Sequence, residues 1–362
     1  MSTKVRNFGL DLLRATAITF VLINHNFNYF ISFNKSTIIG DIFGILGVEL
    51  FFVLSGFLIG GIVLREFGTE VHRKAVKRFY IRRWFRTLPL YYILLITFVG
   101  SSFFITQQFN PQLLHFVFLQ NFSHEALNFF GVSWSLAIEE WFYFLLPILL
   151  YFAYKIKLFK GKILYFLFIF IICMLLARFA FVYFFEPSFD DVRKHVFFRF
   201  DSLIIGVLMA SVKLQKPNWY KFLQNPLLVL FPLAIIGFLA YNFARYFQFG
   251  ILDTSTIARV GAFPILSVAV ALIIPFLEKN NFINNIVGKI KIINFPITWI
   301  SILSYSLYLV HIPIFDIVKA TLLNKIPLEY MPPIALFFAF LISYGLYRCI
   351  EKPFMQLRER YS

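Results

Sequence analysis

Long apolar stretches recur along the whole chain and limit what it can fold into. Ten of them are long enough to cross roughly 30 Å of bilayer hydrocarbon as an α-helix. Hydrophobic residues make up 60% of the 362 residues and charged residues only 14%, which fits a membrane protein far better than two soluble domains. We therefore predict an all-α, polytopic transmembrane bundle of about ten helices. The predicted spans are residues 10–31, 43–64, 87–106, 132–154, 162–184, 195–212, 226–244, 257–277, 297–318 and 331–350.

Lysine and arginine are distributed unevenly over the loops between these spans. Residues 65–86 contain eight of them, whereas residues 105–134 contain none. Because cytoplasmic loops are enriched in Lys and Arg, the bias predicts that both the N- and C-termini are cytoplasmic. It also largely explains the net charge of +16, so we expect no nucleic-acid partner. With no repeat or linker, we expect one domain over residues 1–362 and no fused soluble domain.

Arg14 and His25 lie eleven residues apart in the first predicted span, where a bilayer normally tolerates neither. Eleven helical residues make about three turns and rise about 16 Å, so both side chains are expected on one face. Ionisable residues inside a span indicate a functional site by default. An interhelical hydrogen bond or a snorkelling arginine is the structural alternative.

Ionisable residues of five predicted spans fall at similar depths below the outer surface. At 1.5 Å per helical residue they lie about 6–12 Å from the outer ends of their spans. Isolated charges at that depth are costly, so we expect them to pair around a polar cavity. Separate pairings at helix contacts are the alternative. The residues are His25, Glu49, Glu139, Glu140, Arg199, Asp201 and His311.

A basic segment precedes the third predicted span and contains Arg82, Arg83 and Arg86. Their spacing of three and four residues places guanidinium groups close enough to clamp phosphates. A signal for membrane orientation, or contact with anionic lipid, is the alternative. A polyphosphate ligand on the inner side and a reactive centre nearer the outer side would imply transfer of a group across the membrane.

Six groups of motifs, in order over nearly the whole chain, resemble those of the membrane-bound acyltransferase family 3. This family consists of integral membrane O-acyltransferases, which commonly move acetyl from cytoplasmic acetyl-CoA to sugar hydroxyls of lipopolysaccharide, peptidoglycan or exopolysaccharide. One departure is Glu49, where the family usually has Asp; the charge is kept and the reach is one methylene longer. The motifs are Leu10–Arg14 through His25 with Gly47–Phe57, Arg82–Arg86 before Pro89, Trp134–Glu140, Arg199–Leu203, Ser304–His311 and Glu351–Phe354.

The resemblance implies an O-acyltransferase, most simply an O-acetyltransferase, that is a multi-pass protein of the cytoplasmic (inner) membrane. Acyl-CoA, in the simplest case acetyl-CoA, would be the co-substrate and a sugar or polysaccharide the acceptor, and no metal is expected. By the resemblance, Arg14 and His25 form the family's Arg-x10-His motif. Its CoA-phosphate ligands would be Arg82, Arg83 and Arg86, and its intramembrane acids would be Glu49, Glu139 and Glu140.

The chemistry can also be argued from the residues themselves. Attack of a hydroxyl on a thioester needs a base near pH 7, for which His25 is the natural candidate, with Glu139 or Glu140 orienting its imidazole. Direct transfer and a covalent acyl-His25 are both open. Ser55 lies outside any Gly-x-Ser-x-Gly elbow, so we interpret it as a packing residue. Ser304, on the same helical face as His311, either guides an intermediate or closes a helix contact.

Two other function classes use similar intramembrane residues. A proton-coupled transporter also needs buried His, Glu and Arg, but it should show paired halves with broken helices, and the sequence has no such duplication. A glycan flippase would likewise need a polar cavity. The arginine cluster distinguishes them, because CoA-dependent labelling of a glycan supports an enzyme and solute uptake without CoA supports transport.

Overall fold

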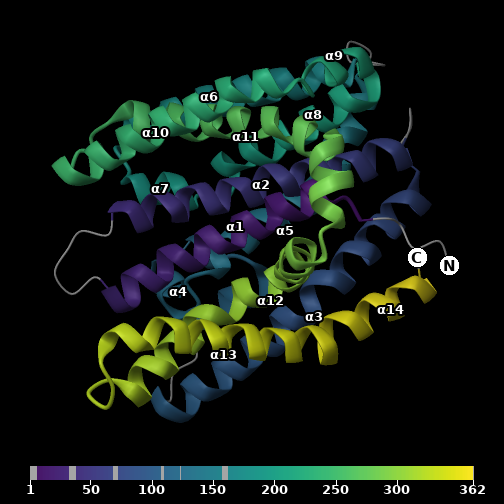
Figure 1. Ribbon diagram of the computed structural model, residues 1–362. Helices are drawn as coiled ribbons and strands as arrows, with labels where there is room; N and C mark the ends of the chain where they lie inside the picture. The colour runs from purple at the N-terminus through teal and green to yellow at the C-terminus, as the bar shows by residue number, and fades with distance from the viewer. Residues whose placement is uncertain are drawn as a thin grey trace.

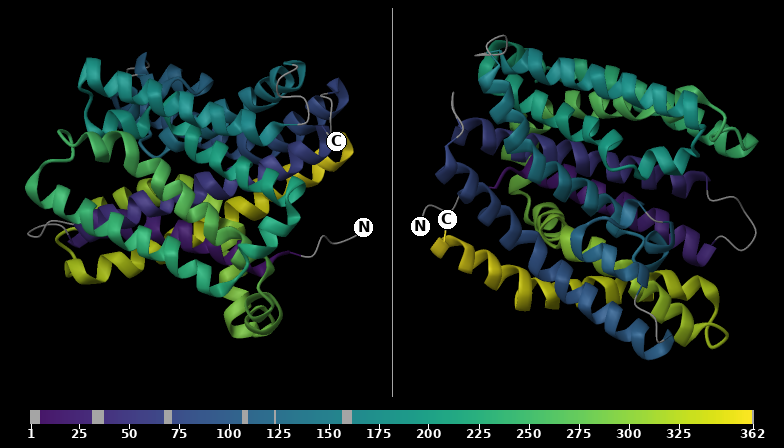
Figure 2. Two further views of the ribbon diagram at one scale, coloured as in Figure 1. Left: turned by 90° about the horizontal axis from the view of Figure 1, so that it is seen from above. Right: turned by 180° about the vertical axis from the view of Figure 1, so that it is seen from behind.

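The computed structural model describes residues 6–31, 38–67, 72–106, 110–122, 124–156 and 162–361. Within these ranges all regular structure is helical, which confirms the predicted all-α class. Eight helices of the described chain are long and apolar enough to cross a membrane. Most of the long helices run side by side along one direction, and α1 begins at the end of the bundle where α14 finishes (Figures 1 and 2). The two ends of the described chain therefore share one side of the bundle.

The long helices correspond one for one to the ten predicted spans. They are α1 (Phe8–Asn26), α2 (Ile38–Phe67), α3 (Arg73–Thr106), α5 (Ser133–Lys155), α6 (Ile163–Phe185), α8 (Phe200–Gln215), α10 (Leu230–Phe249), α11 (Ala262–Lys279), α12 (Lys291–Leu322) and α13 (Met331–Leu346). The shorter helices are α4 (His124–Phe129), α7 (Phe189–Lys194), α9 (Pro217–Phe222) and α14 (Lys352–Tyr361). Short π- and 3₁₀-helical segments join or extend these, at η1 (Phe27–Ile31), η2 (Asn110–Val117), η3 (Gln120–Phe122), η5 (Phe197–Arg199), η6 (Pro226–Val229), η7 (Ile257–Gly261), η8 (Phe282–Ile286), η9 (Val287–Lys289), η10 (Leu328–Tyr330) and η11 (Tyr347–Glu351).

Two predicted spans form helices that do not qualify as membrane spans by themselves, namely α1 and α8. Helix α8 has only 16 residues, and α1 carries Asp11, Arg14 and His25 among its apolar residues. Both lie inside the bundle: α1 packs on α2, α11 and α12, and α8 packs on α2, α6 and α11. Polar side chains are tolerated there because they face protein rather than lipid.

Helix α3 begins at Arg73, well before the predicted span at residues 87–106. Charged residues hid this start, because a hydropathy window stops where lysine and arginine accumulate. Arg83 therefore lies about 15 Å along a continuous helix, at 1.5 Å per residue. The arginine cluster belongs to the wall of the bundle and is not a separate surface segment.

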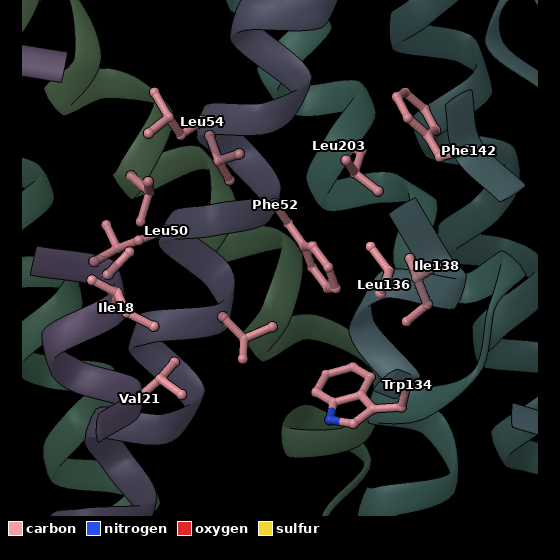
Figure 3. Packing of buried hydrophobic residues seen from close by; sticks show 14 of the residues in the cluster. Ile18, Val21, Leu50, Phe52, Leu54, Trp134, Leu136, Ile138, Phe142 and Leu203 are labelled. Atoms are coloured by element: carbon pink, nitrogen blue, oxygen red, sulfur yellow. The ribbon is translucent and has the colours of Figure 1, made fainter. Parts of the chain in front are cut away.

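The centre of the bundle is built around α2, which packs closely against α8. A Cβ at Gly56 would lie 2.0 Å from the backbone oxygen of Leu203, and one at Gly206 would lie 2.2 Å from that of Val53. Only glycine permits two backbones to approach so closely, as is common between membrane helices. Side chains of α1, α5 and α8 fill the remaining space around Phe52 (Figure 3).

The outer helices have the opposite character. Of the most apolar window of α2, 56% is buried, whereas the corresponding share is 22% for α6 and 17% for α10. Large apolar side chains on α6 and α10 are exposed, among them Phe184 at 73% and Phe238 at 67%. These faces suit contact with lipid, so functional polar groups belong to the inner helices α1, α2, α3, α5 and α12.

Candidate active site

A cavity of about 340 Å³ lies between α1, α2, α3, α5 and α12, and arginines dominate its polar lining. Four guanidinium groups and one carboxylate border it, so the lining carries an excess of positive charge. Its other walls include Phe51, Phe52 and Ile59 of α2. We call it the arginine cavity. Its charged residues are Arg14, Arg65, Arg83, Arg86 and Glu139.

Arg83 and Glu139 form an ion pair in the wall of the arginine cavity, at 3.0 Å. The hydroxyl of Tyr143 donates to the same carboxylate at 2.8 Å, and Ser55 Oγ donates to its other oxygen at 3.1 Å. The Arg83 guanidinium also lies over the Tyr143 ring, 3.8 Å from its centroid. Placing Arg83 at the inner surface and Glu139 near the outer one was therefore wrong, because the early start of α3 brings them to one level.

Arg14 and Arg86 differ from Arg83 in forming no ion pair with a described residue, although Asp11 lies near Arg14 and Glu351 lies near Arg86. Within the described part of the chain neither makes a hydrogen bond or an ion pair. Both also line an adjoining cavity of about 280 Å³, which contains Arg6, Asp11 and Glu351. The two spaces meet at these two arginines, and their guanidinium groups are available to an anionic ligand.

Arg82 does not belong to this site, contrary to the prediction. It is exposed and forms an ion pair with Glu66 at 2.9 Å. Successive residues of an α-helix point about 100° apart, so Arg82 faces outward when Arg83 faces the cavity. Arg86, three residues after Arg83, returns to the cavity side.

A second cavity, of about 540 Å³, lies at the other end of the bundle, where α7 covers the ends of α1 and α2 (Figure 1). Helix α7 begins there because Ser188 and Asp191 form a capping box. We call this space the histidine cavity. It is lined by Asn24, His25, Asn28, Asp41, Ile45, Ser188, Phe189, Asp190, Arg193, Phe247, Leu252 and Asp253.

His25 and His311 are paired at the inner end of the histidine cavity. Nδ1 of His25 lies 3.0 Å from the Val21 carbonyl, and Nδ1 of His311 lies 2.9 Å from the Leu307 carbonyl. A carbonyl only accepts, so both Nδ1 atoms carry the proton. Nε2 of His311 lies 3.0 Å from Nδ1 of His25, so the single N–H of that atom is shared between the Val21 carbonyl and His311. This assignment leaves the Nε2 lone pair of His25 without a partner among the described residues.

Tyr308 lies between the two cavities. Its side chain lines the arginine cavity, and its ring centroid is 6.0 Å from that of His311. The hydroxyl is held by Ser135 Oγ at 2.6 Å and donates to the Val132 carbonyl at 3.1 Å. The arginine and histidine cavities share no lining residue, so Tyr308 and the histidine pair form the partition between them.

Neither glutamate of the predicted pair orients His25. Glu139 is held by Arg83, while Glu140 accepts from Thr87 Oγ1 at 2.9 Å on the other side of α5. The expected contact was wrong because His311 occupies that place. Glu140 lies beside an apolar groove of about 330 Å³ between α3 and α5, separate from the arginine cavity.

Two buried ion pairs lie away from both cavities, and they contain the predicted residues Glu49, Arg199 and Asp201. Glu49 is bound by Arg199 and by Ser267 Oγ, and the Arg199 guanidinium stacks 4.0 Å from the Phe263 ring centroid. Asp201 pairs with Arg178 of α6 at 2.6 Å, with both side chains fully buried. The prediction that these groups gather in one polar cavity was wrong; the alternative of separate pairings at helix contacts describes them.

Ser304 lines the arginine cavity and donates to the Ser301 carbonyl at 3.0 Å. Sequence reasoning missed several polar side chains of the two cavities, and four of them show why. Tyr308 had a detectable signal, since it lies one turn before His311 in the same motif. Ser55 was assigned to packing, but it lines the arginine cavity and contacts Glu139. The remaining two, Asp41 and Arg193, lie outside any motif used for the prediction.

A family model described as an acyltransferase domain matches residues 7–348. That range includes every lining residue of the arginine and histidine cavities. The chain belongs to the membrane-bound acyltransferase family 3. It thus carries an acyltransferase domain of this family, and the eight membrane-capable helices of the described chain fit a multi-pass membrane protein. Among the residues that the structure describes, no group of three or more His, Cys, Asp or Glu side chains is arranged to hold a metal ion.

Two relatives are similar over nearly the whole chain. A Staphylococcus aureus (strain COL) protein named "Putative O-acetyltransferase" is 29% identical over 96% of this chain and 57% of its own length. A Bacillus subtilis (strain 168) protein named "Putative peptidoglycan O-acetyltransferase" is 26% identical over 95% of this chain and 54% of its own length. The chain therefore spans little more than half the length of these relatives. No solved structure matches it.

Proposed function

We propose that the protein moves an acyl group, most simply acetyl, from acyl-CoA on the cytoplasmic side to a hydroxyl of a sugar in a surface or secreted polysaccharide on the outer side of the cytoplasmic membrane. The observation that carries this proposal is the arrangement of two cavities. One has arginines without an ion pair, the other has a histidine whose Nε2 has no partner among the described residues, and Tyr308 of the first lies beside the His311–His25 pair of the second.

The arginine cavity suits the donor. Acyl-CoA carries several phosphates, and Arg14 and Arg86 present guanidinium groups that form no ion pair with a carboxylate of the described chain. Each charge-assisted hydrogen bond to such a ligand contributes about 1.5–3 kcal/mol. The apolar walls around Phe51 and Phe52 accept the uncharged pantetheine arm, whose thioester end would approach Tyr308 and Ser135.

The histidine cavity supplies the base. In the direct route, Nε2 of His25 takes the proton of the acceptor hydroxyl while its oxygen attacks the thioester carbonyl carbon. The C–S bond then breaks, and the leaving thiolate takes the proton from the imidazolium. His311 is a positioning residue, because its Nε2 accepts from His25 Nδ1 and so fixes the tautomer.

A covalent route uses the same groups. Nε2 of His25 would attack the thioester, releasing CoA, and the acceptor hydroxyl would then attack the acyl-imidazole. The two routes differ in one observable. Without acceptor, the covalent route releases one thiol per enzyme in a burst, whereas the direct route releases none.

The acceptor is assigned to the sugar class by the polar lining of the histidine cavity and by the relative whose name refers to peptidoglycan. The test is transfer itself. The full chain is reconstituted in liposomes and given radiolabelled acetyl-CoA on one side and cell-wall glycan on the other. Label in the glycan that requires His25 supports the function, and solute uptake without acetyl transfer contradicts it.

Sidedness is tested separately with introduced cysteines. Cys173 and Cys349 are exposed, so both are first replaced by serine. Lys325→Cys, in the loop between α12 and α13, should then react with an impermeant thiol reagent outside intact cells, and Lys77→Cys, in the first turns of α3, should not. The reverse pattern would contradict transfer from the cytoplasmic side while leaving the acyltransferase chemistry intact.

A further inference from the structure

The histidine cavity differs from the arginine cavity in the sign of its charge. Three carboxylates and one guanidinium line it, those of Asp41, Asp190, Asp253 and Arg193. At about 540 Å³ it falls within the range of about 300–1,000 Å³ typical of small-molecule sites. Its lining therefore carries an excess of negative charge where His25 meets its substrate.

The basic side chains near this cavity already form ion pairs within the protein. Arg193 Nε donates to Asp190 at 2.8 Å, and Lys194 Nζ lies 2.7 Å from the other oxygen of the same carboxylate. Burial opposes ionisation of Asp190, but Arg193 and Lys194 lower its pKa to about 2. With Asp191 of the capping box, the two acidic and two basic side chains of α7 sum to zero, so this helix adds little attraction for an anionic ligand.

Asp41 and Asp253 have only neutral partners. Asp41 accepts from Asn28 Nδ2 at 3.2 Å, and Asp253 accepts from the backbone N–H of Phe189 at 2.6 Å. Neither forms an ion pair within the described part of the chain. Their charges therefore face the cavity without compensation.

The rest of the lining fits a polyhydroxylated ring. Asn24, Asn28 and Ser188 offer amide and hydroxyl groups, which can both donate and accept. Phe189 and Phe247 add aromatic surface against which the apolar face of a sugar can pack. The lone pair of His25 Nε2 completes the set, since it can receive a hydroxyl proton.

We propose that the histidine cavity holds the acceptor sugar and ranks acceptors by charge: an amine-bearing sugar is used best, a neutral sugar next, and a sugar with a carboxylate or phosphate worst. This rests on the proposed function, because the cavity is assigned to the acceptor through His25. The bundle would thus admit an anionic donor at one end and disfavour an anionic acceptor at the other.

The experiment uses three oligosaccharide probes of equal length: a glucosamine tetramer, an N-acetylglucosamine tetramer and a galacturonic acid tetramer. Purified full chain in liposomes is given acetyl-CoA, and kcat/KM is measured for each probe. We expect kcat/KM to fall in that order, by roughly 30-fold for each unit of charge that faces the cavity, which is the size expected for unit charges about 8 Å apart near a protein surface.

The double variant Asp41→Asn/Asp253→Asn removes the two uncompensated charges and keeps an oxygen for each hydrogen bond. It should bring the kcat/KM values of the amine and acid probes closer together. Asp316→Asn is the matched control, a carboxylate on α12 that does not line the cavity, and it should leave the ratio unchanged. A ratio of kcat/KM values does not depend on how much enzyme is folded, so loss of protein cannot imitate the effect.

Two results overturn the inference. Equal use of the three probes, or best use of the galacturonic acid tetramer, would refute selection by charge while the acyltransferase function stands. A double variant with an unchanged ratio would show that selection arises elsewhere. Absence of transfer to every probe would instead reject the acceptor class of the proposed function.

Discussion

The two cavities of this bundle are close together, but the charged side chains that line them have opposite net charge. Among the described residues, Arg14 and Arg86 of the arginine cavity form no ion pair, and neither do Asp41 and Asp253 of the histidine cavity. Other buried charges form ion pairs within the protein, such as Asp201 with Arg178. An unpaired charge beside a cavity is costly unless a ligand completes it. The contrast teaches that depth alone does not identify a site residue; lack of a protein partner does.

Loss of His25 should have the largest effect on the chemistry. His25→Ala removes the lone pair that His25 Nε2 offers to an acceptor hydroxyl, and loss of a general base typically costs about 10²–10⁴ in rate. We expect kcat for transfer to fall by that amount and the KM for acyl-CoA to change little, since the donor binds in the other cavity. Steady-state kinetics in liposomes measure both values.

The control for this change is His72→Ala, because His72 lies before α3 and lines neither cavity. It should transfer acetyl at the normal rate. Near-normal transfer by His25→Ala at equal abundance would remove the histidine cavity from the reaction. If His25→Ala raises only the KM for acyl-CoA, His25 contributes to donor binding and not to the acceptor step.

Breaking a buried ion pair away from the cavities should lower the stability of the protein and leave the chemistry of transfer intact. Glu49→Leu leaves Arg199 buried and unpaired, and breaking a buried ion pair destabilises a protein by about 3–5 kcal/mol. We expect a large drop in the melting temperature measured in detergent. The double variant Glu49→Leu/Arg199→Met should recover much of the loss, because both charges are removed together. If the melting temperature holds and transfer disappears, Glu49 belongs to the chemistry after all.

Much of the fold could be predicted from the sequence because hydropathy reports directly on membrane burial. All ten predicted spans are helices, and Arg14 and His25 lie on the same helix. The site was harder to predict, because the side chains that pair with each other depend on which helices are neighbours, and hydropathy does not report this. Arg83 and Glu139 were assigned to different levels because the charges of α3 concealed its first turns. His311 was placed at the level of His25, as their contact confirms, but nothing in a single sequence indicated that it, and not a glutamate, contacts His25.

The arginine cavity should respond to mutation in donor binding. Arg14→Ala and Arg86→Ala each remove charge-assisted contacts of about 1.5–3 kcal/mol, so the KM for acyl-CoA should rise roughly 10- to 100-fold. The acceptor KM should stay nearly constant. Titration of acyl-CoA at fixed acceptor measures the effect.

Arg82→Ala is the matched control, because Arg82 points away from the cavity and pairs with Glu66. It should leave the KM for acyl-CoA within about twofold, as expected for an exposed ion pair worth about 0–1 kcal/mol. If Arg82→Ala and Arg86→Ala have the same effect, the segment acts through its total charge at the membrane surface. The arginine cavity would then lose its role as the donor site.

The smallest effect is expected at the partition. Tyr308→Phe keeps the ring and removes the hydroxyl that bonds Ser135 Oγ and the Val132 carbonyl. Loss of hydrogen bonds worth about 0.5–1.5 kcal/mol should lower kcat roughly two- to tenfold, with both KM values nearly constant. Tyr308→Ala opens the partition instead, so acetyl-CoA should be hydrolysed without acceptor. If Tyr308→Ala neither lowers transfer nor raises hydrolysis, Tyr308 does not separate the cavities. The thioester would then have to reach His25 by another path.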